Sequence, residues 1–172
     1  ALEQNGGLCF MGVTLVGEGF RISAEQLEQL TLTPASAPTV IRPYLIGRDL
    51  AQKPEKRYVI DFFGFSEAEA KKNYPKLYQW LLDRTYHERQ VNKRRTYREK
   101  WWIFGEPRER MRKALSGLPR YIVTGETAKH RFFQFLPAYV LPDHKLYAIA
   151  IDDAAILAIL SSRIHVVWSL AA

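Results

Sequence analysis

The last third of the chain begins with three short β-forming runs separated by turn residues. The runs are YIVTGE (121–126), HRFFQFLP (130–137) and KLYAIAID (145–152), and they are rich in β-branched and aromatic residues. Such runs favour β-strands, and the glycines and prolines that bound them are typical of turns. A fourth run, RYVIDFFGF at 57–65, has the same character. The chain is therefore predicted to build a β-sheet region.

Helices are predicted between these runs from capping patterns and apolar spacing. Ser23 with Gln26 and Ser66 with Glu69 form capping boxes, which predict one helix over 24–30 and another after Ser66. From Pro75 onward, apolar residues recur at helical spacing and indicate an amphipathic helix. They are Leu77, Tyr78, Leu81, Leu82 and Tyr86.

Further segments complete a predicted α+β fold, with a mixed β-sheet region and several short helices. RERMRKAL at 108–115 indicates a short helix, and the end of the chain is predicted to form one helix from about Asp152 that packs its Ile and Leu face on the sheet. Trp80 and Trp168 lie in amphipathic helices and are predicted core residues. The glycines within 8–22 indicate bulges or a tight hairpin.

Length and composition favour one globular domain over residues 1–172, which could comprise two lobes. Cys9 is the only cysteine, which excludes an intrachain disulfide and favours a reducing, cytoplasmic setting. The N-terminus has no secretory signal and no run approaches the ~20 apolar residues that span a bilayer, so no membrane partner is expected. The chain lacks an initiating Met and ends within an apolar stretch, which predicts a piece of a longer polypeptide.

Positive charge is concentrated in the middle of the chain. Between Arg84 and Arg131 there are 14 Lys+Arg and 5 Asp+Glu, a local excess larger than the formal net charge of +7. Because cations that neutralise phosphates release condensed counterions, a local basic patch favours a nucleic-acid partner. A solvated helix face with local ion pairs, or a face that meets an acidic protein, is the alternative.

The basic region also contains Trp101 and Trp102. Neighbouring residues of an extended segment point in opposite directions, so one of the two is predicted to be buried. Together with Tyr97, Phe132 and Phe133, they could instead form a stacking platform for single-stranded DNA or RNA.

The sequence does not predict a complete active site. Asp61 with Asp152 or Asp153 could serve a small Mg-dependent nuclease, but no Glu-x-Lys follows Asp61 and the Asp pair fits a helix cap better. The histidines have no metal-ligand spacing, so no metal site is expected. Dinucleotide, P-loop and nucleophile-elbow motifs are absent from the sequence.

An ordered set of motifs resembles the target recognition region of type IIG and MmeI-like (type IIL) restriction-modification DNA adenine methyltransferases. The set is NGGLCFMGVTLVGEGF, IRPYLIGRDL, RYVIDFFGF, YPKLYQWL, the basic run into KWWIFGEPR, RYIVTGETAKHRFFQFLP and LSSRIHVVW. The resemblance implies that the chain is the duplex-DNA specificity module of a prokaryotic, cytoplasmic enzyme. Catalysis would belong to an S-adenosylmethionine-dependent methyltransferase domain of the same polypeptide, because this sequence lacks the Asn/Asp-Pro-Pro-aromatic loop and the glycine-rich cofactor loop. The chain alone is therefore expected to be no enzyme and to hold no cofactor.

The resemblance also implies roles for individual residues. Contacts to DNA phosphates, which fix the register of the module, are expected from Lys93, Arg94, Arg95, Arg98, Lys100, Arg108 and Arg112. Base reading is expected from the TGETAKHRFF segment, namely Glu126, Thr127, Lys129, His130 and Arg131, with Glu126 able to accept from a cytosine amino group. Weaker candidates are Arg48, Trp101, Trp102 and Arg163. Arg48 with Asp49 could equally form a structural ion pair, and the polar run at 161–165 could equally cap a helix.

Overall fold

The computed structural model describes residues 6–52, 55–127 and 132–171. The chain divides into two compact units, one of residues 1–12, 45–54 and 108–172, and the other of residues 13–44 and 55–107. We refer to them as unit 1 and unit 2. Within the described ranges no helix combines the length and the apolar character that a membrane span requires.

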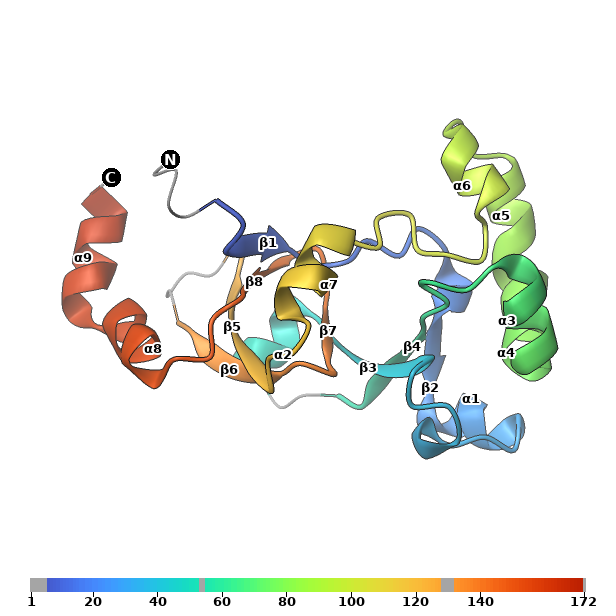
Figure 1. Cartoon of the computed structure of the whole chain (residues 1–172), viewed down its shortest axis with the longest axis horizontal. Coiled ribbons are helices and arrows are strands. Elements are labelled where there is room, and N and C mark those ends of the chain that lie inside the picture. The colour runs from blue at the N-terminus through green and yellow to red at the C-terminus, as the bar shows by residue number, and fades with distance from the viewer. Residues whose placement is uncertain (1–5, 53–54, 128–131, 172) are drawn as a thin grey trace. The chain divides into compact units, whose positions relative to one another are not determined.

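Unit 1 is built on an antiparallel sheet with the strand order β1-β8-β5-β6 (Figure 1). The strands are β1 (Cys9–Met11), β8 (Leu146–Ile149), β5 (Arg120–Gly125) and β6 (Gln134–Pro137). The last three confirm the predicted β-forming runs. Because side chains alternate along a strand, the sheet has one buried face with Val123 and Ala148 and a more open face with Thr124 and Tyr147.

Three short elements contact strands of this sheet. They are α2 (Gly47–Ala51) beside β5, β7 (Leu141–Pro142) beside β8 and α7 (Glu109–Leu115) beside β1. Helix α7 confirms the helix predicted over 108–115, buries Met111 and Leu115 one turn apart, and contacts β1. Gly117 follows it with a φ of 86°, a conformation that favours glycine at a helix end.

The end of the chain forms two helices, so the prediction of a single helix was wrong. Helix α8 (Ala154–Ser161) begins at Asp153, whose carboxylate accepts from Ala155 N–H at 2.7 Å, and α9 (Arg163–Ala171) follows an extended Ser162. Ser162 Oγ accepts from His165 N–H at 3.2 Å, which confirms a capping role for the polar run. Helix α8 has no fully buried residue, although Leu160 lines a cavity together with residues of the sheet, and Trp168 is 68% exposed instead of being a core residue.

Unit 2 contains a second antiparallel ladder, in which β4 (Arg57–Ile60) pairs with both β2 (Arg21–Ser23) and β3 (Ile41–Leu45). β1 and β2 thus belong to different sheets, and the hairpin considered for residues 8–22 does not form. Both capping boxes are confirmed, at the starts of α1 (Ala24–Gln29) and α3 (Glu67–Asn73). Unit 2 also contains two short 3-10 helices. The first, η2 (Glu18–Phe20), precedes β2, and the second, η3 (Pro34–Ser36), follows α1.

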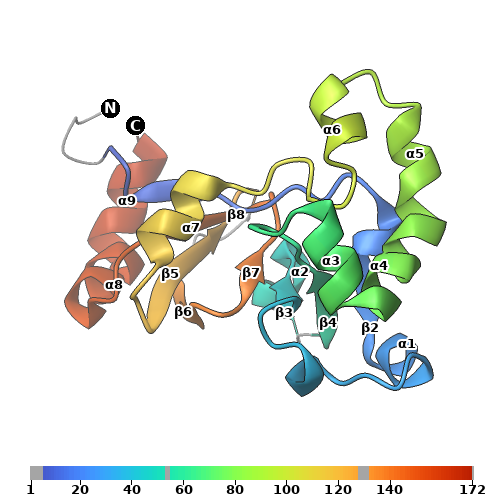
Figure 2. The same ribbon diagram turned by 45° about the vertical axis from the view of Figure 1, so that its right-hand side comes forward.

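The amphipathic helix predicted from Pro75 runs through α4 (Pro75–Leu81), a π-helical turn η4 (Leu82–Tyr86) and α5 (His87–Gln90), as Figure 2 shows. Its buried side includes Leu77, Leu81 and Trp80, and the burial of Trp80 confirms its predicted core position. The short helix α6 (Arg95–Glu99) follows and carries part of the basic region.

Candidate nucleic-acid interface

Exposed cations gather around the turn from α5 to α6 in unit 2. Lys93, Arg94, Arg95 and Lys100 are all exposed. Arg94, with its side chain 65% exposed, lies 3.1 Å from Glu106, and Arg95 lies 2.7 Å from Glu99. Surface ion pairs of this kind contribute little stability, so a phosphate can replace the carboxylate at small cost. These four side chains can therefore reach an anionic partner.

Other predicted phosphate contacts are used within the chain. Arg98 donates from Nη1 to Asn92 O at 2.6 Å and to Lys93 O at 3.2 Å, which closes the turn before α6. Arg108 belongs to unit 1, where its Nε donates to Gly12 O at 3.1 Å. Arg112 is half-buried on α7. We assign Arg98 and Arg108 structural roles that their sequence context did not reveal.

The tryptophan pair is held by hydrogen bonds from both indoles. Trp101 is 3% exposed and its Nε1 donates to Glu67 Oε1 at 3.1 Å, which confirms that one tryptophan of the pair is buried. Trp102 is half-buried and donates to Phe65 O at 3.0 Å. Tyr97 is also buried. Two of the five rings predicted to form a stacking platform for single strands are therefore buried, and the platform does not form in this conformation.

A buried arginine lies beneath the basic turn. Arg89 is 1% exposed and its Nη2 donates to Leu15 O at 3.0 Å and to Ile103 O at 2.8 Å. Its guanidinium carbon lies 5.2 Å and 5.0 Å from the ring centres of Phe20 and Tyr97. Burial lowers the pKa of Arg89 to about 10, so that it remains charged at neutral pH.

The predicted reading segment follows β5 in unit 1, where Glu126 and Thr127 are exposed. Glu126 N–H donates to Lys145 O at 2.9 Å, and Lys145 Nζ lies 2.7 Å from Glu126 Oε2. The hydrogen bond to this carboxylate and its charge raise the pKa of Lys145. Sequence reasoning missed Lys145, although the pairing of YIVTGE with KLYAIAID would have placed it beside Glu126. Lys129, His130 and Arg131 lie outside the described residues.

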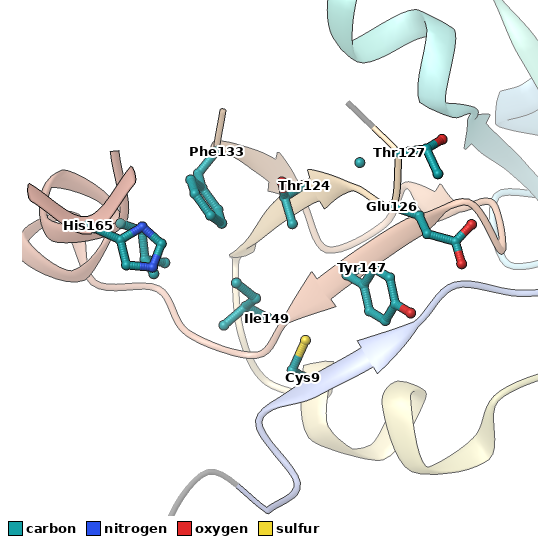
Figure 3. A pocket seen from close by; sticks show the side chains of 10 residues that line it. Cys9, Thr124, Glu126, Thr127, Phe133, Tyr147, Ile149 and His165 are labelled. Carbon is teal, nitrogen blue, oxygen red and sulfur yellow. The ribbon is translucent and has the colours of Figure 1, made fainter. Parts of the chain in front are cut away.

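A cavity of about 380 Å³ lies on the open face of the unit 1 sheet, beside this segment (Figure 3). Glu126 and Thr127 line one end and His165 lines the other. Between them lie aromatic, aliphatic and small polar side chains, and Figure 3 shows Thr124 between the rings of Phe133 and Tyr147. The remaining lining residues are Cys9, Gly125, Ile149 and Leu160.

The Cys9 thiol reports on this cavity. Desolvation by surrounding atoms raises its pKa, although the residue itself is exposed on β1. Since only the thiolate reacts, the pH midpoint of Cys9 alkylation should be higher in the folded protein than in the urea-unfolded chain. Below both midpoints the folded protein should react more slowly, as a stopped iodoacetamide reaction followed by mass spectrometry would measure. Identical midpoints in the two states would contradict a desolvated thiol.

Of the remaining candidates, the two arginines lie on the surface and the aspartate caps a helix. Arg48 on α2 and Arg163 on α9 are exposed, whereas Asp49 is buried and accepts from Ile46 N–H at 3.1 Å, inside the first turn of α2. The side chains of Arg48 and Arg163 can therefore contact a partner.

The carboxylates of the nuclease alternative have structural partners. Asp61 lies in unit 2, is buried and accepts from Phe63 N–H at 3.2 Å, while Asp152 pairs with Arg120 and Asp153 caps α8. Among the residues that the structure describes, no group of His, Cys, Asp and Glu is arranged to hold a metal ion. These contacts do not favour the nuclease.

Comparison with known proteins gives one family and a solved relative. Residues 10–171 match a family model described as MmeI, target recognition domain. A structure of the type IIL restriction-modification enzyme MmeI in complex with DNA is similar, with a TM-score of 0.73 at 16% sequence identity, over 94% of this chain and 21% of that chain. The likeness confirms the α+β fold, and this chain spans about a fifth of that MmeI chain. The comparison with curated proteins gives no match.

Proposed function

The chain belongs to the MmeI target recognition domain family, and on that premise we propose that it reads the sequence of duplex DNA for a type IIL or IIG adenine-N6 methyltransferase. The exposed cations around the α5–α6 turn carry this proposal, because they form a set that can neutralise phosphates. Its two units act together as one target recognition domain. Methyl transfer from S-adenosylmethionine takes place in a catalytic domain outside this chain, since the sequence contains neither of the motifs that such a domain needs.

Phosphate contacts come from Lys93, Arg94, Arg95 and Lys100. Such contacts position a protein on the duplex and carry no sequence information. Arg98 supports this set indirectly, because its bonds to Asn92 O and Lys93 O fix the turn that presents Lys93.

Base reading comes from the segment after β5 and from Lys145. A carboxylate accepts from the cytosine N4 amino group, and a lysine donates to guanine O6 and N7. Glu126 and Lys145, 2.7 Å apart, therefore offer one acceptor and one donor at the same place. Thr127 adds a hydroxyl that can serve either role.

Replacing Lys93 and Lys100 by serine tests the proposal. If each lysine contacts one phosphate, the slope of log affinity against log salt should become shallower by about 2, and affinity near 0.1 M salt should fall roughly 50-fold. The measurement is fluorescence anisotropy with a labelled duplex, with single-stranded DNA and RNA in parallel. The parent chain should prefer the duplex.

The matched control replaces Lys71 and Lys72 of α3 by serine. These two lysines are exposed in the same unit, so the control removes the same charge from a different surface. It should bind within about twofold of the parent. Equal losses in both double variants would indicate a diffuse charge effect, and the absence of any duplex binding at low salt would overturn the proposal.

A further inference from the structure

The cavity on the open face of the unit 1 sheet, which we call the slot, has Phe133 and Tyr147 on either side of Thr124 (Figure 3). Thr124 pairs with Tyr147 in the β5–β8 ladder, and Thr124 Oγ1 donates to Phe132 O at 2.9 Å, directly before Phe133. Phe133 directly precedes β6 and Tyr147 lies on β8, so their backbones flank β5 at a spacing of about 10 Å, and Thr124 is the side chain that Figure 3 draws between them. Side chains that rise from backbones at this spacing leave room for one planar ring between them, about 5 Å from each side, which is inside the range of aromatic stacking.

The walls of this slot combine apolar and hydrogen-bonding groups. Phe133 is braced by an edge contact with His165, with 5.7 Å between ring centres. The Nδ1 atom of His165 is buried and has no hydrogen-bond partner among the described residues. Thr127 and Glu126 supply polar groups at the opposite end. A planar ligand with an apolar face and hydrogen-bonding groups along its edge would match both the aromatic and the polar residues that line the slot.

We propose that this slot binds one extrahelical nucleobase of the bound DNA, stacked between Phe133 and Tyr147. This inference rests on the proposed function, because the segment that is proposed to read base edges also forms one end of the slot. A nucleobase has the two stacking faces and the donor and acceptor edge that the slot accommodates. The cavity volume of about 380 Å³ lies in the range of ordinary ligand pockets. The slot is recessed, whereas side chains that read intact base pairs must project into a groove.

The test compares a duplex that carries one unpaired thymidine with a fully paired duplex of the same flanks. An unpaired base is the easiest to extrude, and one stacked base is worth roughly tenfold in affinity. The bulged duplex should therefore bind about tenfold more tightly in fluorescence anisotropy. At saturation it should also slow alkylation of Cys9, which lines the slot, more than the paired duplex does.

Two tyrosine variants distinguish an effect on the slot from a general effect of removing a tyrosine. Tyr147→Leu should abolish the preference for the bulged duplex, whereas Tyr139→Leu, at a tyrosine that is 64% exposed in the same unit, should retain it. Equal affinity for the two duplexes with equal Cys9 protection would overturn the slot and leave the proposed function standing. Failure to bind either duplex would overturn both. The rate of Cys9 alkylation in the parent protein, measured with each duplex bound, tests the slot even if Tyr147→Leu does not fold.

Discussion

Replacing Gly12 by alanine is expected to lower the free energy of unfolding of unit 1 by more than about 3 kcal/mol. A Cβ atom at Gly12 would lie 2.2 Å from Asp143 O, 2.4 Å from Pro142 O and 2.7 Å from Asp143 C. All three are backbone atoms, so no side-chain rotation can relieve the clash. Gly12 N–H also donates to Leu146 O at 2.9 Å, which fixes the approach of the two segments. Urea unfolding followed by far-UV circular dichroism would measure the loss.

Gly47→Ala is the matched control. A Cβ atom at Gly47 would meet nothing within 4 Å among the described residues, and the position lies in the first turn of α2. Alanine there should stabilise the helix by up to about 1 kcal/mol. If Gly12→Ala stayed within about 1 kcal/mol of the parent, the strand would have room to shift and the close approach would not constrain the fold.

The contrast between these glycines shows which features of the fold can be predicted from the sequence. The capping boxes at Ser23 and Ser66 were predictable because each bond joins residues three positions apart. The role of Gly12 was not, because its neighbours Pro142 and Asp143 are brought to it only by the sheet. The same limit explains why glycines in 8–22 suggested a hairpin, although β1 pairs with β8 instead.

The same limit applies to the candidate site, where features local in the sequence were predictable and contacts made only by the folded chain were not. Local charge excess was sufficient to predict a basic surface, but it could not separate Lys93 from Arg98, because the carbonyl acceptors of Arg98 depend on the turn that the folded chain adopts. Lys145 lies far along the chain from the basic region and becomes a candidate only through its ion pair with Glu126. For Trp168 the sequence predicted a burial that does not occur, because helical periodicity identifies an apolar face but does not specify what covers it.

Replacing Arg89 by methionine is expected to destabilise unit 2 by about 2–4 kcal/mol. Methionine keeps much of the volume but cannot donate, so Leu15 O and Ile103 O would lose the charge-assisted bonds that Arg89 provides. Part of the loss is offset because the guanidinium no longer has to be desolvated, and its Nε and Nη1 have no partners among the described residues. Chemical denaturation at neutral pH would measure the difference.

The consequence should extend to DNA binding, because Tyr97 connects the buried and the exposed arginine. The guanidinium carbons of Arg89 and Arg94 lie 5.0 Å and 5.1 Å from the centre of the Tyr97 ring, and Arg94 donates to the Tyr97 hydroxyl at 2.5 Å. Loss of Arg89 should therefore loosen Arg94 and weaken duplex binding in protein that is still folded. Arg84→Met is the control, since Arg84 is exposed and stacks on Trp80 at 3.4 Å, and it should cost less than about 1 kcal/mol. An Arg89→Met protein that matched or exceeded the parent in stability would mean that desolvating the buried charge outweighs its two carbonyl bonds.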